Sequence, residues 1–161
     1  MTDKLAAAVE HRRAQRYDDA RALLAELYAA NPDDAQVNYQ YGWLHDSMGD
    51  ESGAVPYYER AIALGLPDDD LRGALLGLGS TYRTVGQYEK AVDTLRHGMA
   101  QFPQAGEFPV FLAMALYNMG DHAQAMALLL NALATSSTDP GIQQYQRAIL
   151  FYADKLDETW G

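Results

Sequence analysis

A few short stretches of the sequence carry residue types that do chemistry in other proteins. Gly77-Leu-Gly-Ser80 has the first glycine spacing of a dinucleotide-binding loop, in which glycines let the backbone approach a pyrophosphate. Tyr82 stands where the third glycine would be, and no strand is expected before this stretch. A helical role for these glycines is the preferred interpretation, and no nucleotide cofactor is predicted.

Metal chemistry has equally little support in the sequence. His11 and His45 occur at equivalent positions of a repeat described below, but two histidines alone make a poor metal site. The acidic triplet Asp68–Asp70 lacks the longer run of alternating oxygen ligands that calcium needs. The chain has no cysteine, which removes thiolate catalysis and zinc sites built on Cys. We expect packing and helix capping here, and no metal.

Acid-base catalysis has no candidate either, since no carboxylate pair is placed beside a nucleophile. We therefore predict that the protein is not an enzyme. An enzyme of unknown chemistry remains the alternative from another functional class.

Composition and charge set the broad class. With 161 residues, 48% of them hydrophobic and 21% charged, the chain is predicted to form one globular domain, 1–161. A net charge of −10 would repel nucleic acid. The N-terminal apolar run is only five residues long, so neither a signal peptide nor a membrane span is expected, and a cytoplasmic location is predicted.

The chain repeats itself. Four alanines recur at spacings of 34, 37 and 34 residues, and three glycines follow the last two of these spacings. A period of this length indicates stacked structural units. The residues are Ala20, Ala54, Ala91 and Ala125, with Gly49, Gly86 and Gly120.

Within each unit, apolar or small residues form two stripes with helical spacing on either side of the glycine. The third unit reads Leu75, Leu78, Gly79, Tyr82, Ala91, Leu95, Gly98 and Pro103. This pattern resembles the tetratricopeptide repeat, a helical hairpin of about 34 residues. It predicts repeats over 1–34, 35–71, 72–105 and 106–139. The whole is similar to small stand-alone bacterial proteins of this type.

The glycines are predicted to have two different roles. Gly42 and Gly79, and Ala113 in the fourth repeat, should let the two helices of a hairpin approach each other. Gly49, Gly86 and Gly120 should end first helices, where a positive φ is needed, and Asp50 and Asp121 should cap the helices that follow. Pro56 predicts that the second helix of its repeat begins late, with Ser52 as the N-cap.

After the fourth repeat, Asp139-Pro140 predicts the start of a long terminal helix over 140–160. Its apolar residues form one stripe, with Leu150 and Phe151 beside it. The predicted fold is therefore all-α, a right-handed solenoid of four helical hairpins plus a long C-terminal helix that caps the last repeat.

Positions 5 and 9 of each repeat should face outward or line the inner curve. Seven of the eight residues there are apolar, which indicates either contact between neighbouring first helices or a binding face. The predicted protein-binding residues are Tyr39, Trp43, Leu76, Arg83, Val110, Met114 and Tyr117.

Some members of the resembling family hold a peptide carboxylate with Lys at position 5 and Asn at position 9. No repeat of this chain has either residue. Arg12, Arg13 and Arg83 lie at positions 12 and 13, where an acidic group could meet them.

These features predict a non-catalytic module that binds an apolar peptide or helix in its concave groove. The predicted partner is a protein or peptide segment with apolar anchors, with no nucleic acid, membrane or cofactor. The alternative is a homodimer whose grooves are occupied by its own terminal helices; the resembling bacterial proteins are also thought to dimerise.

Overall fold

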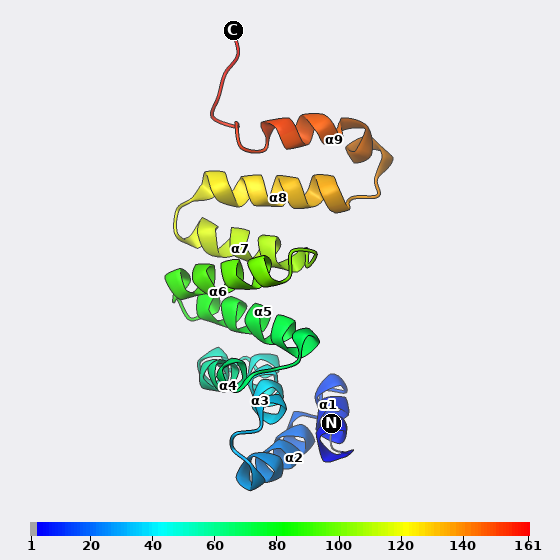
Figure 1. Ribbon diagram of the computed structural model, residues 1–161, viewed down its shortest axis with the longest axis vertical. Coiled ribbons are helices and arrows are strands. Elements are labelled where there is room, and N and C mark those ends of the chain that lie inside the picture. Colours follow the sequence, from blue (N-terminus) through cyan, green and yellow to red (C-terminus); the bar gives the residue numbers. More distant parts are fainter. Residues whose placement is uncertain (1–2) are drawn as a thin grey trace. The chain divides into compact units, whose positions relative to one another are not determined.

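The computed structural model describes residues 3–161, and this part of the chain is all-α (Figure 1). The chain divides into two compact units, the first ending at Gln87 and the second beginning at Tyr88. The single domain over 1–161 stays a prediction. The first unit contains α1 (Asp3–Arg13), α2 (Tyr17–Ala30), α3 (Ala35–Ser47), α4 (Glu51–Leu64) and α5 (Asp68–Thr84). The second contains α6 (Tyr88–Gln101), α7 (Glu107–Asn118), α8 (His122–Ser136) and α9 (Pro140–Tyr152).

Consecutive helices pack against each other within each unit. In the first unit, α1 packs on α2, α2 on α3, α3 on α4 and α4 on α5, and α3 also contacts both α1 and α5. In the second, α6 packs on α7, α7 on α8 and α8 on α9. The predicted all-α fold of helical hairpins is therefore confirmed. None of the described helices has both the length and the apolar character needed to cross a membrane.

The turn glycines have the predicted conformation. Gly49, Gly86 and Gly120 have φ values of +75°, +82° and +85°, in the left-handed region that only glycine adopts without strain. The carboxylates of Asp50 and Asp121 then accept hydrogen bonds from backbone N–H groups in the first turns of α4 and α8, each at 3.1 Å. Both capping predictions are confirmed.

The prediction for Pro56 is wrong. Helix α4 begins at Glu51 with Asp50 as its N-cap, so Pro56 lies inside the helix rather than in its first turn. The Asp50 cap starts the helix before Ser52, and Pro56 then leaves the carbonyl of Ser52 without its helical donor. Both Ser52 and Pro56 are exposed, so water can take the place of that donor.

The terminal helix is shorter than expected. Asp139 caps α9 by accepting from the N–H of Ile142 at 3.0 Å, as its sequence predicts, but the helix ends at Tyr152 instead of residue 160. At this end the Nζ of Lys155 donates to the carbonyl of Phe151 at 3.1 Å. The following segment is rich in acidic residues that disfavour a helix C-terminus.

A small set of contacts explains the close approach of the helices. A Cβ on Gly42 would lie 2.9 Å from the ring of Tyr58, and one on Gly77 would lie 2.7 Å from it. Tyr58 of α4 thus fills the space between α3 and α5. In the second unit, Phe108 of α7 occupies the corresponding space against Gly98 of α6. The contact role predicted for Gly42 is confirmed.

Candidate binding surfaces

The predicted binding residues of α3 have very different exposures. Tyr39 and Trp43 lie one helical turn apart with ring centroids 5.6 Å from each other. Tyr39 is only 4% exposed, whereas Trp43 is 40% exposed. The hydroxyl of Tyr39 reaches α5, where a Cβ on Gly73 would be 2.1 Å away. Burial raises the pKa of Tyr39 to about 12, so its hydroxyl is neutral, and most of the ring is used in packing.

Trp43 is covered on one side by a cation. The guanidinium of Arg12, from α1, lies 3.7 Å above the centroid of the Trp43 ring. Its Nη2 donates to the Oε1 of Gln40 at 3.3 Å. Arg12 is only 7% exposed, and this burial lowers the pKa of its guanidinium. Trp43 is therefore the exposed member of this cluster, and Arg12 and Gln40 are buried beside it.

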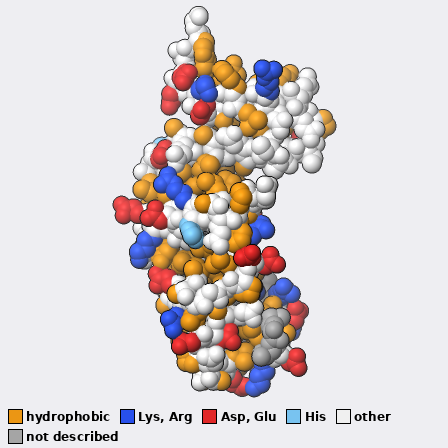
Figure 2. All heavy atoms as spheres, in the orientation of Figure 1, with side chains coloured by type: hydrophobic (Ala, Val, Ile, Leu, Met, Phe, Trp, Pro, Cys, Tyr) orange, Lys and Arg blue, Asp and Glu red, His pale blue; other side chains and the backbone are white. Residues whose placement is uncertain are grey.

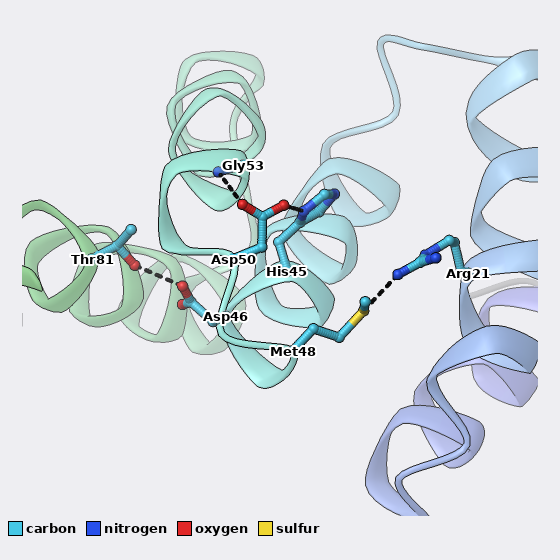
Figure 3. Close-up of polar contacts among 7 residues, drawn as sticks. All are labelled: Arg21, His45, Asp46, Met48, Asp50, Gly53 and Thr81. Atoms are coloured by element: carbon cyan, nitrogen blue, oxygen red, sulfur yellow. Dashed lines mark hydrogen bonds and ion pairs between the residues drawn. The ribbon is translucent and has the colours of Figure 1, made fainter. Parts of the chain in front are cut away.

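A carboxylate near the end of α3 ties three helices together. Asp46 accepts from the hydroxyl of Tyr58 on α4 at 2.8 Å. It also accepts from the hydroxyl of Thr81 on α5 at 2.9 Å (Figure 3). Burial raises the pKa of Asp46, and the two hydrogen bonds partly oppose that rise. Sequence reasoning missed this contact, because an aspartate late in a helix is usually a solvated residue.

The neighbouring turn is also closed by polar contacts (Figure 3). The Nδ1 of His45 lies 2.7 Å from the Oδ2 of Asp50, whose other oxygen caps α4. The hydrogen bond to His45 is the main cause that lowers the pKa of Asp50. The His45 ring also stacks on Tyr57, with centroids 5.2 Å apart. His45 therefore packs within the first unit, as the sequence suggests.

The remaining predicted residues lie on α5 and α7. Leu76 and Arg83 are half-buried on α5. In the second unit Val110 is half-buried on α7, while Met114 and Tyr117 on the same helix are 38% and 64% exposed. Tyr117 lies beside the ring of His122, with centroids 4.7 Å apart. The binding role of all seven residues stays a prediction.

The second unit exposes apolar side chains that the sequence pattern did not single out. Helix α8 contains no Asp, Glu, Lys or Arg, and α7 and α9 contain one charged residue each, Glu107 and Arg147. Three exposed residues form a stripe on α8 with helical spacing: Met126, Leu129 and Leu133. Figure 2 shows that hydrophobic side chains reach the surface on the face in view.

One member of this stripe is unexpected. Leu129 occupies the repeat position of Leu24, Tyr58 and Leu95, which are all fully buried. In the first unit, Tyr58 is covered by the next helix at Gly77. Helix α9 packs on α8 and is held there by a hydrogen bond from the Nε2 of Gln146 to the carbonyl of Ala134, at 2.8 Å. It nevertheless leaves Leu129 exposed.

A pocket of about 710 Å³ opens in the second unit between the start of α8 and the segment after α9. Its walls include His122 and Met126 on one side and residues 153–158 on the other. Residues 3–161 contain no group of three His, Asp or Glu side chains that could hold a metal ion.

Most of the sequence matches a known protein family. Residues 35–156 match the model of a family described as tetratrico peptide repeat. Among curated protein sequences, none matches the chain.

Several solved structures have a similar fold. One is the APC/C hetero-tetramer Cut9-Hcn1, with a TM-score of 0.76 and 19% identity over 93% of this chain, which spans only 29% of the matched chain. A MamA RS-1 ArsTM double mutant has a TM-score of 0.74 and 18% identity, covering 98% of this chain and 89% of its own. YrrB, described as a TPR protein with an unusual peptide-binding site, has a TM-score of 0.73 and 16% identity, covering 88% of this chain and 71% of its own. At these identities the likeness concerns the fold.

Proposed function

Because this chain belongs to the tetratricopeptide repeat family, we propose that it is a non-catalytic interaction module that binds an apolar peptide or helix of a protein partner. The observation that carries the proposal is the exposure of Trp43 in the first unit and of Met114 and Tyr117 in the second. Aromatic and methionine side chains at a surface suit adaptable recognition.

Each exposed anchor contributes to the affinity when a partner covers it. Burial of an exposed apolar side chain contributes about 1.5–3 kcal/mol. Micromolar binding needs about 8 kcal/mol net of the costs of association, so the partner must add polar and backbone contacts to those of the anchors. YrrB, whose fold is similar, is described as having a peptide-binding site, which supports the proposal by analogy.

The test compares two substitutions in the first unit. Wild type, Trp43→Asp and Met48→Asp are used to capture partners from the native lysate, and each recovered protein is then titrated against the purified variants. Met48 is the matched control, because it is similarly exposed but lies at the end of α3. We expect Trp43→Asp alone to lose binding. Equal binding by the wild type and both variants would show that partners do not bind at Trp43.

A second candidate function is self-association through the terminal helix. It is favoured by the exposure of Leu129, Tyr145 and Phe151, which leaves an apolar face on both α8 and α9. A symmetric pair of chains would bury both faces at once. In this function the terminal helix of one chain occupies the binding surface of the other.

Light scattering coupled to gel filtration tests this candidate on the full chain and on a chain ending at Asp139. We expect a dimer for the full chain and a monomer for the truncated chain. A monomeric full chain at tens of micromolar would reject self-association, and a dimer that survives the truncation would reject the terminal helix as its cause.

A further inference from the structure

Arg12 is a buried cation without a carboxylate partner among the described residues. Its Nε is buried and makes no hydrogen bond there, and its one side-chain hydrogen bond, to Gln40, is long. The neighbouring arginines differ: Arg13 pairs with Glu10 at 2.9 Å, and Arg16 lies 3.8 Å from Asp19. A buried charge without a counterion destabilises the folded state. We therefore expect Arg12 to have a function that offsets this cost.

The surroundings of Arg12 favour an anion. The groups that act on its charge are the tyrosines 17, 39 and 58 and the cation Arg13, and none of them is a carboxylate. The face of Trp43 offsets part of the burial cost through a cation–π contact. A carboxylate that reached the guanidinium would supply the missing charge, and an apolar group next to it would cover the exposed part of Trp43.

The segment after α9 has this chemistry. It reads Asp154-Lys-Leu-Asp-Glu-Thr-Trp-Gly161, and Asp157, Glu158 and Trp160 are all exposed. Lys155 pairs with Asp154, whereas Asp157 and Glu158 make no ion pair with any residue in 3–161. Two carboxylates therefore lie two and three residues before an exposed tryptophan.

We infer that the segment Asp154–Gly161 of a second copy of this chain docks on the Arg12–Trp43 surface. The carboxylates of Asp157 and Glu158 pair with the Arg12 guanidinium, and Trp160 packs against Trp43. The inference rests on the proposed function, because it requires the Trp43 surface to be a binding surface. In that function the bound segment is Asp154–Gly161, and Arg12 is the residue that selects an acidic sequence.

A complementation experiment tests the contact with full-length chains. Arg12→Met lacks the docking surface but keeps the tail, and the double variant Asp157→Asn, Glu158→Gln lacks the tail charges but keeps the surface. Analytical ultracentrifugation is expected to show self-association of the wild type and a monomer for each variant alone. An equimolar mixture of the two variants is expected to form a dimer, since each then supplies the part that the other lacks.

The expected weakening for each variant alone is about thirtyfold or more. Arg13→Met is the matched control, since Arg13 is exposed and already paired with Glu10, and it should associate like the wild type. Thermal melting separates binding from folding, because a chain that stays folded at the temperature of the binding assay and fails to associate has lost the contact and not the fold.

Three results would overturn the inference: a monomeric wild type at about 100 μM, a concentration at which contacts of micromolar affinity are populated; an Arg12→Met chain that still associates; or a mixture of the variants that stays monomeric. A monomeric wild type together with a loss of captured partners by Trp43→Asp would contradict the tail contact alone. It would still support the function as an interaction module.

Discussion

The two units use the same repeat but leave very different surfaces. In the first unit the large side chains are mostly buried, and Trp43 and Met48 are its only exposed large hydrophobic residues within 3–87. In the second unit thirteen such residues are exposed, and α8 contains no Asp, Glu, Lys or Arg. The first unit packs its large side chains around Asp46 and Tyr58, while the second leaves apolar area exposed, and exposed apolar area is typical of interaction surfaces in other proteins.

The contrast is sharpest at one repeat position, which is Tyr58 in α4 and Leu129 in α8. Tyr58 is buried between two glycines of neighbouring helices, whereas Leu129 lies at the surface. The same repeat position therefore has opposite environments, because α5 covers Tyr58 whereas α9, which packs on α8, leaves Leu129 exposed.

The largest expected effect is that of Tyr58→Ala. The change removes a fully buried ring and the hydroxyl that donates to Asp46, so we expect the free energy of unfolding to fall by about 3–5 kcal/mol. Leu129→Ala, at the same repeat position, should cost about 1 kcal/mol or less, because its side chain is largely solvated. Urea unfolding of both variants measures this difference; equal losses would mean that Leu129 is covered in solution.

Next in size is the effect of adding a methyl group at a helix contact. Gly98→Ala would place a Cβ 2.1 Å from the ring of Phe108, and we expect it to cost about 1–3 kcal/mol. Gly106→Ala is the control, since its Cβ would meet nothing within 4 Å and its φ is ordinary. A tolerated Gly98→Ala would show that the second unit is more loosely packed than the first.

Substitutions of Asp46 test how much its hydrogen bonds stabilise the first unit. Asp46→Ala leaves the hydroxyls of Tyr58 and Thr81 without their acceptor, which we expect to cost about 1–2 kcal/mol in the free energy of unfolding. Asp46→Asn keeps an acceptor but cannot titrate. It separates the hydrogen bonds of the carboxylate from its charge.

The pH dependence of Asp46 has a definite sign. Because its folded-state pKa is raised, the native protein binds this proton more readily than the unfolded chain does, and lowering the pH through that pKa stabilises the fold. The wild type should therefore gain stability relative to Asp46→Asn as the pH falls from the raised pKa toward the ordinary value for an aspartate. Chemical denaturation at several pH values measures the gain, and a constant difference would contradict the burial of this charge.

Local features of the fold were predictable from the sequence. The turn at Gly120 and the helix caps at Asp50 and Asp139 depend on a few neighbouring residues, so their types suffice to place them. The hairpins follow from the period of the apolar residues. Pro56 was misjudged because a stronger cap two residues before Ser52 starts the helix earlier.

The surfaces were less predictable, because exposure depends on residues far apart in the sequence. Tyr39 and Trp43 look equivalent in the pattern, but Tyr39 is buried against Gly73 and Trp43 is not. The partnership of Arg12 with Trp43 joins two repeats and has no signal in either one. The exposure of Leu129 was missed for a similar reason, since the repeat pattern assumes that another repeat follows.

The smallest expected change in the free energy of unfolding is that of a substitution in the exposed stripe of α8. Leu133→Gln replaces an exposed apolar side chain on this stripe and should change the free energy of unfolding by no more than about 0.5 kcal/mol. Leu112→Gln, at a buried position of α7 in the same unit, should cost several times more, because it buries an amide without a partner. If the stripe is an interaction surface, Leu133→Gln should reduce binding of a hydrophobic dye and weaken self-association while the melting curve stays unchanged. If Leu133→Gln destabilised the protein as much as Leu112→Gln, the stripe would belong to the core. The two units would then differ in sequence but not in how much apolar surface they expose.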